Sequence, residues 1–101
     1  MAKLLVEKTT RCSSKEAFLK VKTLLETDDM LRRLDSNLIC QFDEVRLEGC
    51  AKGGQFRADL RVEPQSGGAK VAIDVTLSFL LGPLKEKVRS VLQKKLDECL
   101  D

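Results

Sequence analysis

Residues 70–100 read KVAIDVTLSFLLGPLKEKVRSVLQKKLDECL, and they predict one strand that turns a tight corner into one long helix. In the first part, apolar and polar residues alternate with a period of two, which is typical of a strand with one buried face. The apolar positions are Val71, Ile73, Val75 and Leu77. Gly82-Pro83 interrupts this pattern, and proline suits the first position of a helix because its φ angle is already helical.

Beyond Pro83, apolar residues recur at steps of three and four, so they line one stripe of a helix. They are Leu84, Val88, Val91, Leu92, Leu96 and Cys99. A strand with one apolar face and a helix with one apolar stripe are each stable only against another element. We therefore expect the helix that carries Val88, Leu92 and Leu96 to pack on the apolar face of the sheet.

Length and composition indicate a globular protein. The chain has 101 residues, which fits a single domain over 1–101, and 43% of them are hydrophobic. The 18 basic and 16 acidic residues leave a formal charge of +2, too balanced for a nucleic-acid-binding surface. No apolar run is long enough for a transmembrane helix. The start, MAKLLVEKTT, is too poor in apolar residues for an export signal, so we expect a cytoplasmic protein.

The N-terminal half predicts a strand, a helix and two short strands. The first strand covers residues 3–9. Ser13 and Glu16 then form the pattern of a capping box, which predicts that a helix begins there. This helix carries an apolar stripe to residue 35, with a kink or a restart near Asp28, because aspartate favours caps over helix interiors. Alternation over residues 38–42 and 45–50 predicts the two short strands.

The clearest strand lies between two glycine pairs. Phe56, Ala58, Leu60 and Val62 alternate with charged residues, which is typical of an antiparallel sheet with one packed face. Gly53-Gly54 precedes this strand and Gly67-Gly68 follows it, and we expect glycine to supply the positive φ that hairpin turns require. The fold class is therefore α+β, an antiparallel sheet in the order β-α-β-β-β-β-α. Both helices, including the long C-terminal one, cover one face of the sheet.

Most chemistry of active sites is excluded by the residue types. The chain has no histidine, so no Ser-His-Asp or Cys-His arrangement exists within it. The glycine pairs do not have the spacing of phosphate-binding loops. The spacing of the four cysteines matches no zinc or redox motif, and we interpret them as free thiols. They are Cys12, Cys40, Cys50 and Cys99. We expect neither a metal nor a cofactor.

Two carboxylates remain as candidates for acid–base chemistry. Asp59 and Asp74 fall on the polar faces of two strands that we expect to be neighbours. Arg57 and Arg61 flank Asp59 on the same face, so cross-strand ion pairs are the ordinary explanation. A small enzyme that uses Asp59 and Asp74 stays the less favoured alternative.

The corner is the one segment whose apolar character is unusual for a loop. Phe79, Leu80, Leu81 and Leu84 lie around Gly82-Pro83, and neither strand nor helix periodicity buries all four. One interpretation places the corner in the core beneath the first helix. Another makes it an exposed site for a lipid, a polymer or a protein partner. A homodimer that buries the corner is a third, purely structural interpretation.

The segment from residue 56 to residue 100, with its FLLGPL corner and charged helix, resembles the polyhydroxyalkanoic acid system proteins of the polyhydroxyalkanoate granule region in bacteria. The element order is also similar to a shortened helix-grip domain, in which a sheet wraps a C-terminal helix around an apolar cavity. These resemblances imply a non-enzymatic, granule-associated accessory protein. Its partner would be a polyhydroxyalkanoate granule or an acyl or lipid ligand, bound through Phe79, Leu80, Leu81 and Leu84.

Overall fold

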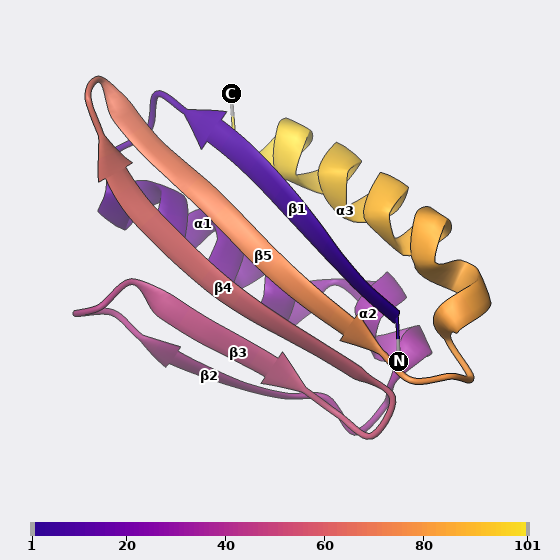
Figure 1. The fold of residues 1–101 in the computed structure, drawn as a ribbon. Helices are drawn as coiled ribbons and strands as arrows, with labels where there is room; N and C mark the ends of the chain where they lie inside the picture. Colours follow the sequence, from indigo (N-terminus) through magenta and orange to yellow (C-terminus); the bar gives the residue numbers. More distant parts are fainter. Residues whose placement is uncertain (1, 101) are drawn as a thin grey trace.

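The computed structural model describes residues 2–100 and contains one antiparallel sheet and three α-helices (Figure 1). The elements are β1 (Ala2–Thr10), α1 (Ser14–Thr27), α2 (Asp29–Leu34), β2 (Ile39–Asp43), β3 (Glu48–Lys52), β4 (Phe56–Gln65), β5 (Gly68–Leu77), the 3-10 turn η1 (Gly82–Leu84) and α3 (Lys85–Cys99). The strands lie in the order β1-β5-β4-β3-β2. The predicted fold class and element order are confirmed, with the first helix divided in two.

The long hairpin of β4 and β5 forms the centre of the sheet. Leu60 pairs with Ile73, and each strand turns its alternate residues to the helices. All of the predicted inward residues are buried, namely Phe56, Ala58, Leu60, Val62, Val71, Ile73, Val75 and Leu77. Because strand residues alternate strictly between the two faces, this register places every charged residue of β4 on the opposite, solvent-facing side.

The helix boundaries follow from two side-chain caps. Ser13 Oγ accepts a hydrogen bond from the N–H of Glu16, 3.2 Å away, and so begins α1 as predicted. Asp28 has extended backbone angles (φ −72°, ψ 121°), which ends α1. Its carboxylate accepts the N–H of Leu31 at 3.1 Å and begins α2. The restart expected near Asp28 is therefore a change of helix with a shared cap residue.

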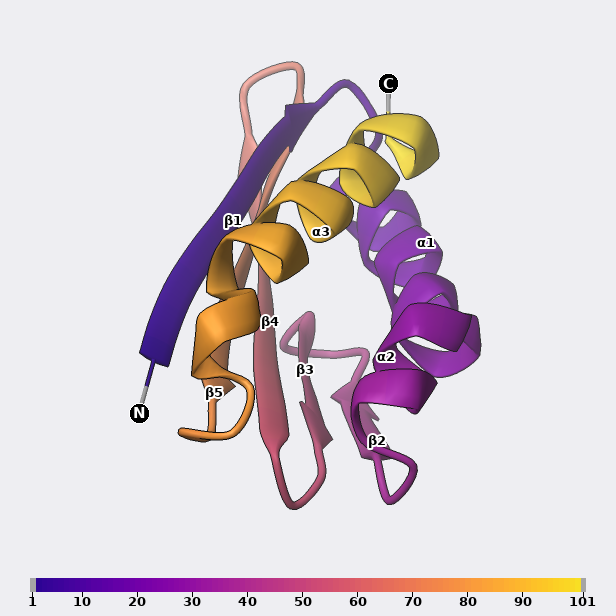
Figure 2. The same cartoon turned by 90° about the vertical axis from the view of Figure 1, so that its right-hand side faces the viewer.

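All three helices cover the same side of the sheet (Figure 2). Helix α1 packs over β4 and β5, whereas α3 packs mainly along β1 and against α1. Val88, Leu92 and Leu96 of α3 are buried as predicted. The sequence did not indicate that α1 takes the place above the central hairpin, so that the C-terminal helix lies beside it, over the β1 side of the sheet.

Two details of the predicted turns are wrong. The strand expected over 45–50 begins only at Glu48, because Asp43 accepts the N–H groups of Val45 and Arg46 at 3.0 and 3.1 Å and holds a turn there. Leu47, at the end of this turn, has a positive φ of 58°. Between β4 and β5, Gly67 has the positive φ expected of a hairpin glycine, at 80°. The glycine pair before β4 has no positive φ, so its role in the turn is a different one.

None of the helices within residues 2–100 is long and apolar enough to cross a bilayer.

Candidate functional site

The corner between β5 and α3 is held by backbone hydrogen bonds within itself and to the turn before β4. The N–H of Ser78 donates to the carbonyl of Gln55 at 3.0 Å, and the N–H of Leu81 donates back to the carbonyl of Ser78 at 3.1 Å. This turn leads into η1, which contains Pro83, and α3 begins two residues later, at Lys85, and not at Pro83 as predicted. Backbone hydrogen bonds therefore join the corner both to itself and to Gln55.

The four apolar residues of the corner have different environments. Phe79 is 85% exposed and Leu80 is 74% exposed, while Leu84 is 38% exposed. Leu81, in contrast, belongs to the hydrophobic core with 8% of its surface exposed. The first two interpretations of the corner, burial in the core and exposure to solvent, thus apply to different residues. Leu81 anchors the corner in the core, and Phe79 and Leu80 extend from it into solvent.

A groove lies beside the corner, between α2 and α3. We call it the α2–α3 groove; its volume is about 420 Å³, within the range of small-molecule sites. It is lined by Asp29, Met30, Arg33, Leu34, Leu84, Lys87, Val88 and Lys95. Leu84 belongs both to the corner and to the lining of the groove, so the two share this residue.

An ion pair beside the groove links α3 to the residue that caps α2. Lys95 of α3 lies at the groove and binds Asp28, whose side chain is 3% exposed. The same carboxylate caps α2 through Leu31. Asp28 therefore fixes both the start of α2 and the position of α3 beside it.

Sequence reasoning missed the groove. Met30 and Leu34 were interpreted as part of a continuous apolar helical stripe, and both are only partly buried against the core. The signal that was available is the break at Asp28, since a helix that restarts at that residue changes direction and leaves part of its stripe uncovered.

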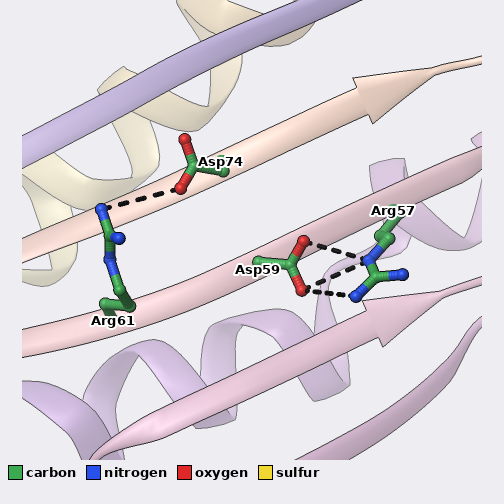
Figure 3. Close-up of polar contacts among 4 residues, drawn as sticks. All are labelled: Arg57, Asp59, Arg61 and Asp74. Atoms are coloured by element: carbon green, nitrogen blue, oxygen red, sulfur yellow. Dashed lines mark hydrogen bonds and ion pairs between the residues drawn. The ribbon is translucent and has the colours of Figure 1, made fainter.

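The alternative site, on the outer face of the sheet, consists of ion pairs (Figure 3). Asp59 and Asp74 are direct cross-strand partners, so the sequence correctly placed them together. Arg57 donates to Asp59 within β4, with Nε 3.0 Å from Oδ2, and Arg61 reaches across to Asp74 with its Nη2 3.7 Å from Oδ2. Each carboxylate thus has its own cation, although only one of the pairs crosses between strands.

The electrostatics of this face agree with the ion-pair explanation. The hydrogen bond to Asp59, together with the charge of that carboxylate, raises the pKa of Arg57 above its ordinary value. Cys50 lies opposite Asp59 on β3, and partial burial raises the pKa of its thiol, with the charge of Asp59 adding to the effect. A thiol with a raised pKa is a poor nucleophile near neutral pH. Within residues 2–100, no group of three or more acidic or cysteine side chains is arranged to hold a metal ion.

Comparison with known proteins shows the fold. The chain superimposes on the crystal structure of TTHA0849 from Thermus thermophilus with a TM-score of 0.58 and 13% identity, covering 97% of this chain and 93% of that one. It superimposes on the crystal structure of Ara h 8.0201 with a TM-score of 0.64 and 12% identity, covering 97% and 94%. No protein-family model and no curated protein matches the chain. The fold is therefore helix-grip-like, as one of the two resemblances implied.

Proposed function

We propose that this protein is a non-enzymatic accessory protein that binds an acyl ligand or an apolar surface through its corner and the α2–α3 groove. The observation that carries the proposal is the exposure of Phe79 and Leu80 at a corner whose Leu84 also lines the α2–α3 groove. Exposed apolar side chains that adjoin a groove are typical of interaction sites. Leu84 joins the two parts, and Leu81 acts as the buried anchor of the corner.

The available free energy is sufficient for a useful affinity. Fully covering a leucine or phenylalanine side chain stabilises a complex by about 1.5–3 kcal/mol. Phe79, Leu80 and Leu84 together offer several kilocalories per mole, from which the loss of translational and side-chain freedom on association is subtracted. The corner is already rigid through its backbone hydrogen bonds, so little further ordering of the chain is required.

The resemblance to the polyhydroxyalkanoic acid system proteins suggests the finer form of the proposal. In that form the partner is polyhydroxyalkanoate granule material or a related hydroxyacyl compound. The exposed corner is compatible with this partner, since a polyester surface is apolar and requires no deep cavity. The resemblance alone selects the granule among apolar partners.

The test is partition of the purified protein onto amorphous polyhydroxybutyrate particles, compared with phospholipid vesicles. The variant Leu80→Ser removes an exposed apolar side chain of the corner, while Leu5→Ser removes one from the outer face of the sheet, where Leu5 is 45% exposed. We expect the wild-type chain and Leu5→Ser to bind the particles, and Leu80→Ser to bind several-fold more weakly. Circular dichroism checks that both variants are folded.

Equal partition of Leu80→Ser and Leu5→Ser would show that the corner does not contribute to binding. Binding to vesicles but not to polyester would keep the apolar partner and exclude the granule. Measuring the mass of the protein in solution tests the interpretation that the corner is buried in a homodimer. If the chain forms a stable dimer that Leu80→Ser dissociates, the corner is a subunit interface and no ligand is needed to explain its exposure.

A further inference from the structure

The α2–α3 groove combines an apolar floor with a basic rim. The floor consists of Met30, Leu34, Leu84 and Val88. Arg33 projects from α2 and Lys87 from α3, so the two cations belong to opposite walls of the same groove. Such a site has one region suited to a hydrocarbon chain and another suited to a negative charge.

The rim of the groove carries more positive than negative charge. Lys95 is neutralised by Asp28, which is buried and already serves as the cap of α2. Within residues 2–100, no ion pair or side-chain hydrogen bond engages Arg33 or Lys87, although many other basic residues of the chain are paired with acidic ones. Asp29 is the remaining acidic residue of the lining. Two unpaired cations therefore face one carboxylate, and the rim is electropositive.

We propose that the groove prefers an amphiphile with a carboxylate head group, such as a free fatty or hydroxyacyl acid, over an uncharged alcohol with the same chain. Its tail lies on the apolar floor and continues toward the exposed corner, while its carboxylate lies between Arg33 and Lys87. A guanidinium group matches a carboxylate with two parallel hydrogen bonds, and an ammonium group adds a point charge. This inference rests on the proposed function and specifies the ligand class of the same site.

The test compares ligands that differ only in one part. The full chain, labelled with ¹⁵N, is titrated at low ionic strength with decanoate, with decanol, which has the same chain but no charge, and with acetate, which has the charge but no chain. Exposed ion pairs contribute modestly, so we expect decanoate to bind about threefold to tenfold more tightly than decanol. Acetate should cause no saturating shift. Added salt should reduce the preference for decanoate and leave decanol binding unchanged.

Two variants test whether the basic residues of the rim cause the preference for decanoate over decanol. The double variant Arg33→Gln/Lys87→Gln should bind decanoate and decanol equally, with its affinity for decanol retained. Lys94→Gln is the matched control, because Lys94 lies on α3 but lines a different surface, with Glu86, Gln93 and Asp97. It removes one positive charge from the same helix, and we expect it to keep the preference of the wild-type chain.

The outcomes distinguish this inference from the proposed function. Equal binding of decanoate and decanol to the wild-type chain overturns the carboxylate site but leaves the proposed function intact, because a purely apolar groove still binds an acyl chain. Saturable binding of acetate with the affinity of decanoate overturns it as well, since the tail then contributes nothing. If the double variant still prefers decanoate over decanol, Arg33 and Lys87 do not bind the carboxylate of the ligand. Failure of both long-chain ligands to bind rejects an acyl ligand altogether.

Discussion

Gly53 lies against the buried carboxylate of Asp35, and this contact decides which residue the turn between β3 and β4 accepts. A Cβ atom at position 53 would overlap the Asp35 carboxylate, whereas one at Gly54 would meet nothing within 4 Å. The carboxylate accepts the N–H of Gln55 at 2.7 Å and that of Asn37 at 3.1 Å. It cannot move aside without leaving these N–H groups unpaired, which is costly where they are shielded from water.

Replacement of Gly53 by alanine should therefore destabilise the protein, while the same change at Gly54 should not. We expect Gly53→Ala to lower the free energy of unfolding by about 1–3 kcal/mol through overpacking. Gly54→Ala should stay within about 0.5 kcal/mol of the wild type, as is usual at open surface positions. Urea denaturation followed by circular dichroism measures both values. Similar losses in the two variants would show that the turn depends on glycine flexibility and not on the contact with Asp35.

This contact also shows what the sequence pattern could and could not predict about single residues. A glycine pair between two strands correctly predicted a turn. Its cause was misassigned, because neither Gly53 nor Gly54 has a positive φ. The close approach of Asp35 comes from a segment outside the hairpin, and local pattern carries no information about such a neighbour. At Gly67, where the requirement is local backbone conformation, the same reasoning was correct.

At the scale of elements, Asp28 connects three helices. It ends α1, caps α2 through the N–H of Leu31 and pairs with Lys95 of α3. The side chain is almost completely buried, so its charge depends on these partners for stabilisation. One carboxylate thus links the two helices that form the walls of the α2–α3 groove.

Removing this carboxylate should loosen the helices. We expect Asp28→Ala to lower the free energy of unfolding by about 2 kcal/mol, of which the lost helix cap accounts for about 1 kcal/mol. The adjacent Asp29→Ala is the control. Asp29 is exposed, so its loss should cost less than about 0.5 kcal/mol. Chemical denaturation at pH 7 compares the two. Equal costs would mean that Asp28 does not act through its buried contacts.

The helices and strands were easier to predict from the sequence than the way in which they pack against one another. The restart at Asp28 followed from the capping preference of aspartate, and the stripe of α3 followed from its helical periodicity. Periodicity identifies which side of a helix is buried, but not which partner buries it. The apolar stripes of α1 and α3 are alike in kind, and only the assembled structure shows that α1 lies over β4 and β5 while α3 lies over β1.

In the whole molecule, the sheet separates a packed side from a charged side. Strict alternation in β4 and β5 predicted this division, because successive side chains of a strand point to opposite faces of the sheet. The candidate groove has no periodic signal of this kind, and only the break at Asp28 points to it. Its lining comes from α2, η1 and α3, which are far apart in the sequence and meet only after the sheet and α1 have brought them together.

The same division predicts opposite results for one substitution at two leucines. Leu60 is 1% exposed at the centre of the sheet, and Leu80 is 74% exposed at the corner. Leu60→Asp loses the apolar contacts of a core leucine, worth about 2–5 kcal/mol, and adds the burial of an unpaired carboxylate. Since small domains are stable by only about 5–15 kcal/mol, we expect Leu60→Asp to abolish the cooperative thermal transition.

Leu80→Asp places the same charge in water, and its melting temperature should stay within a few degrees of the wild type, because little apolar area is lost. Thermal unfolding monitored by circular dichroism compares the two variants. A normal transition for Leu60→Asp would contradict the inward face of β4. A collapse of Leu80→Asp would mean that the corner is buried in solution, by the core or by a second copy. Stability must therefore depend on Leu60 and not on Leu80 if the corner is exposed for binding.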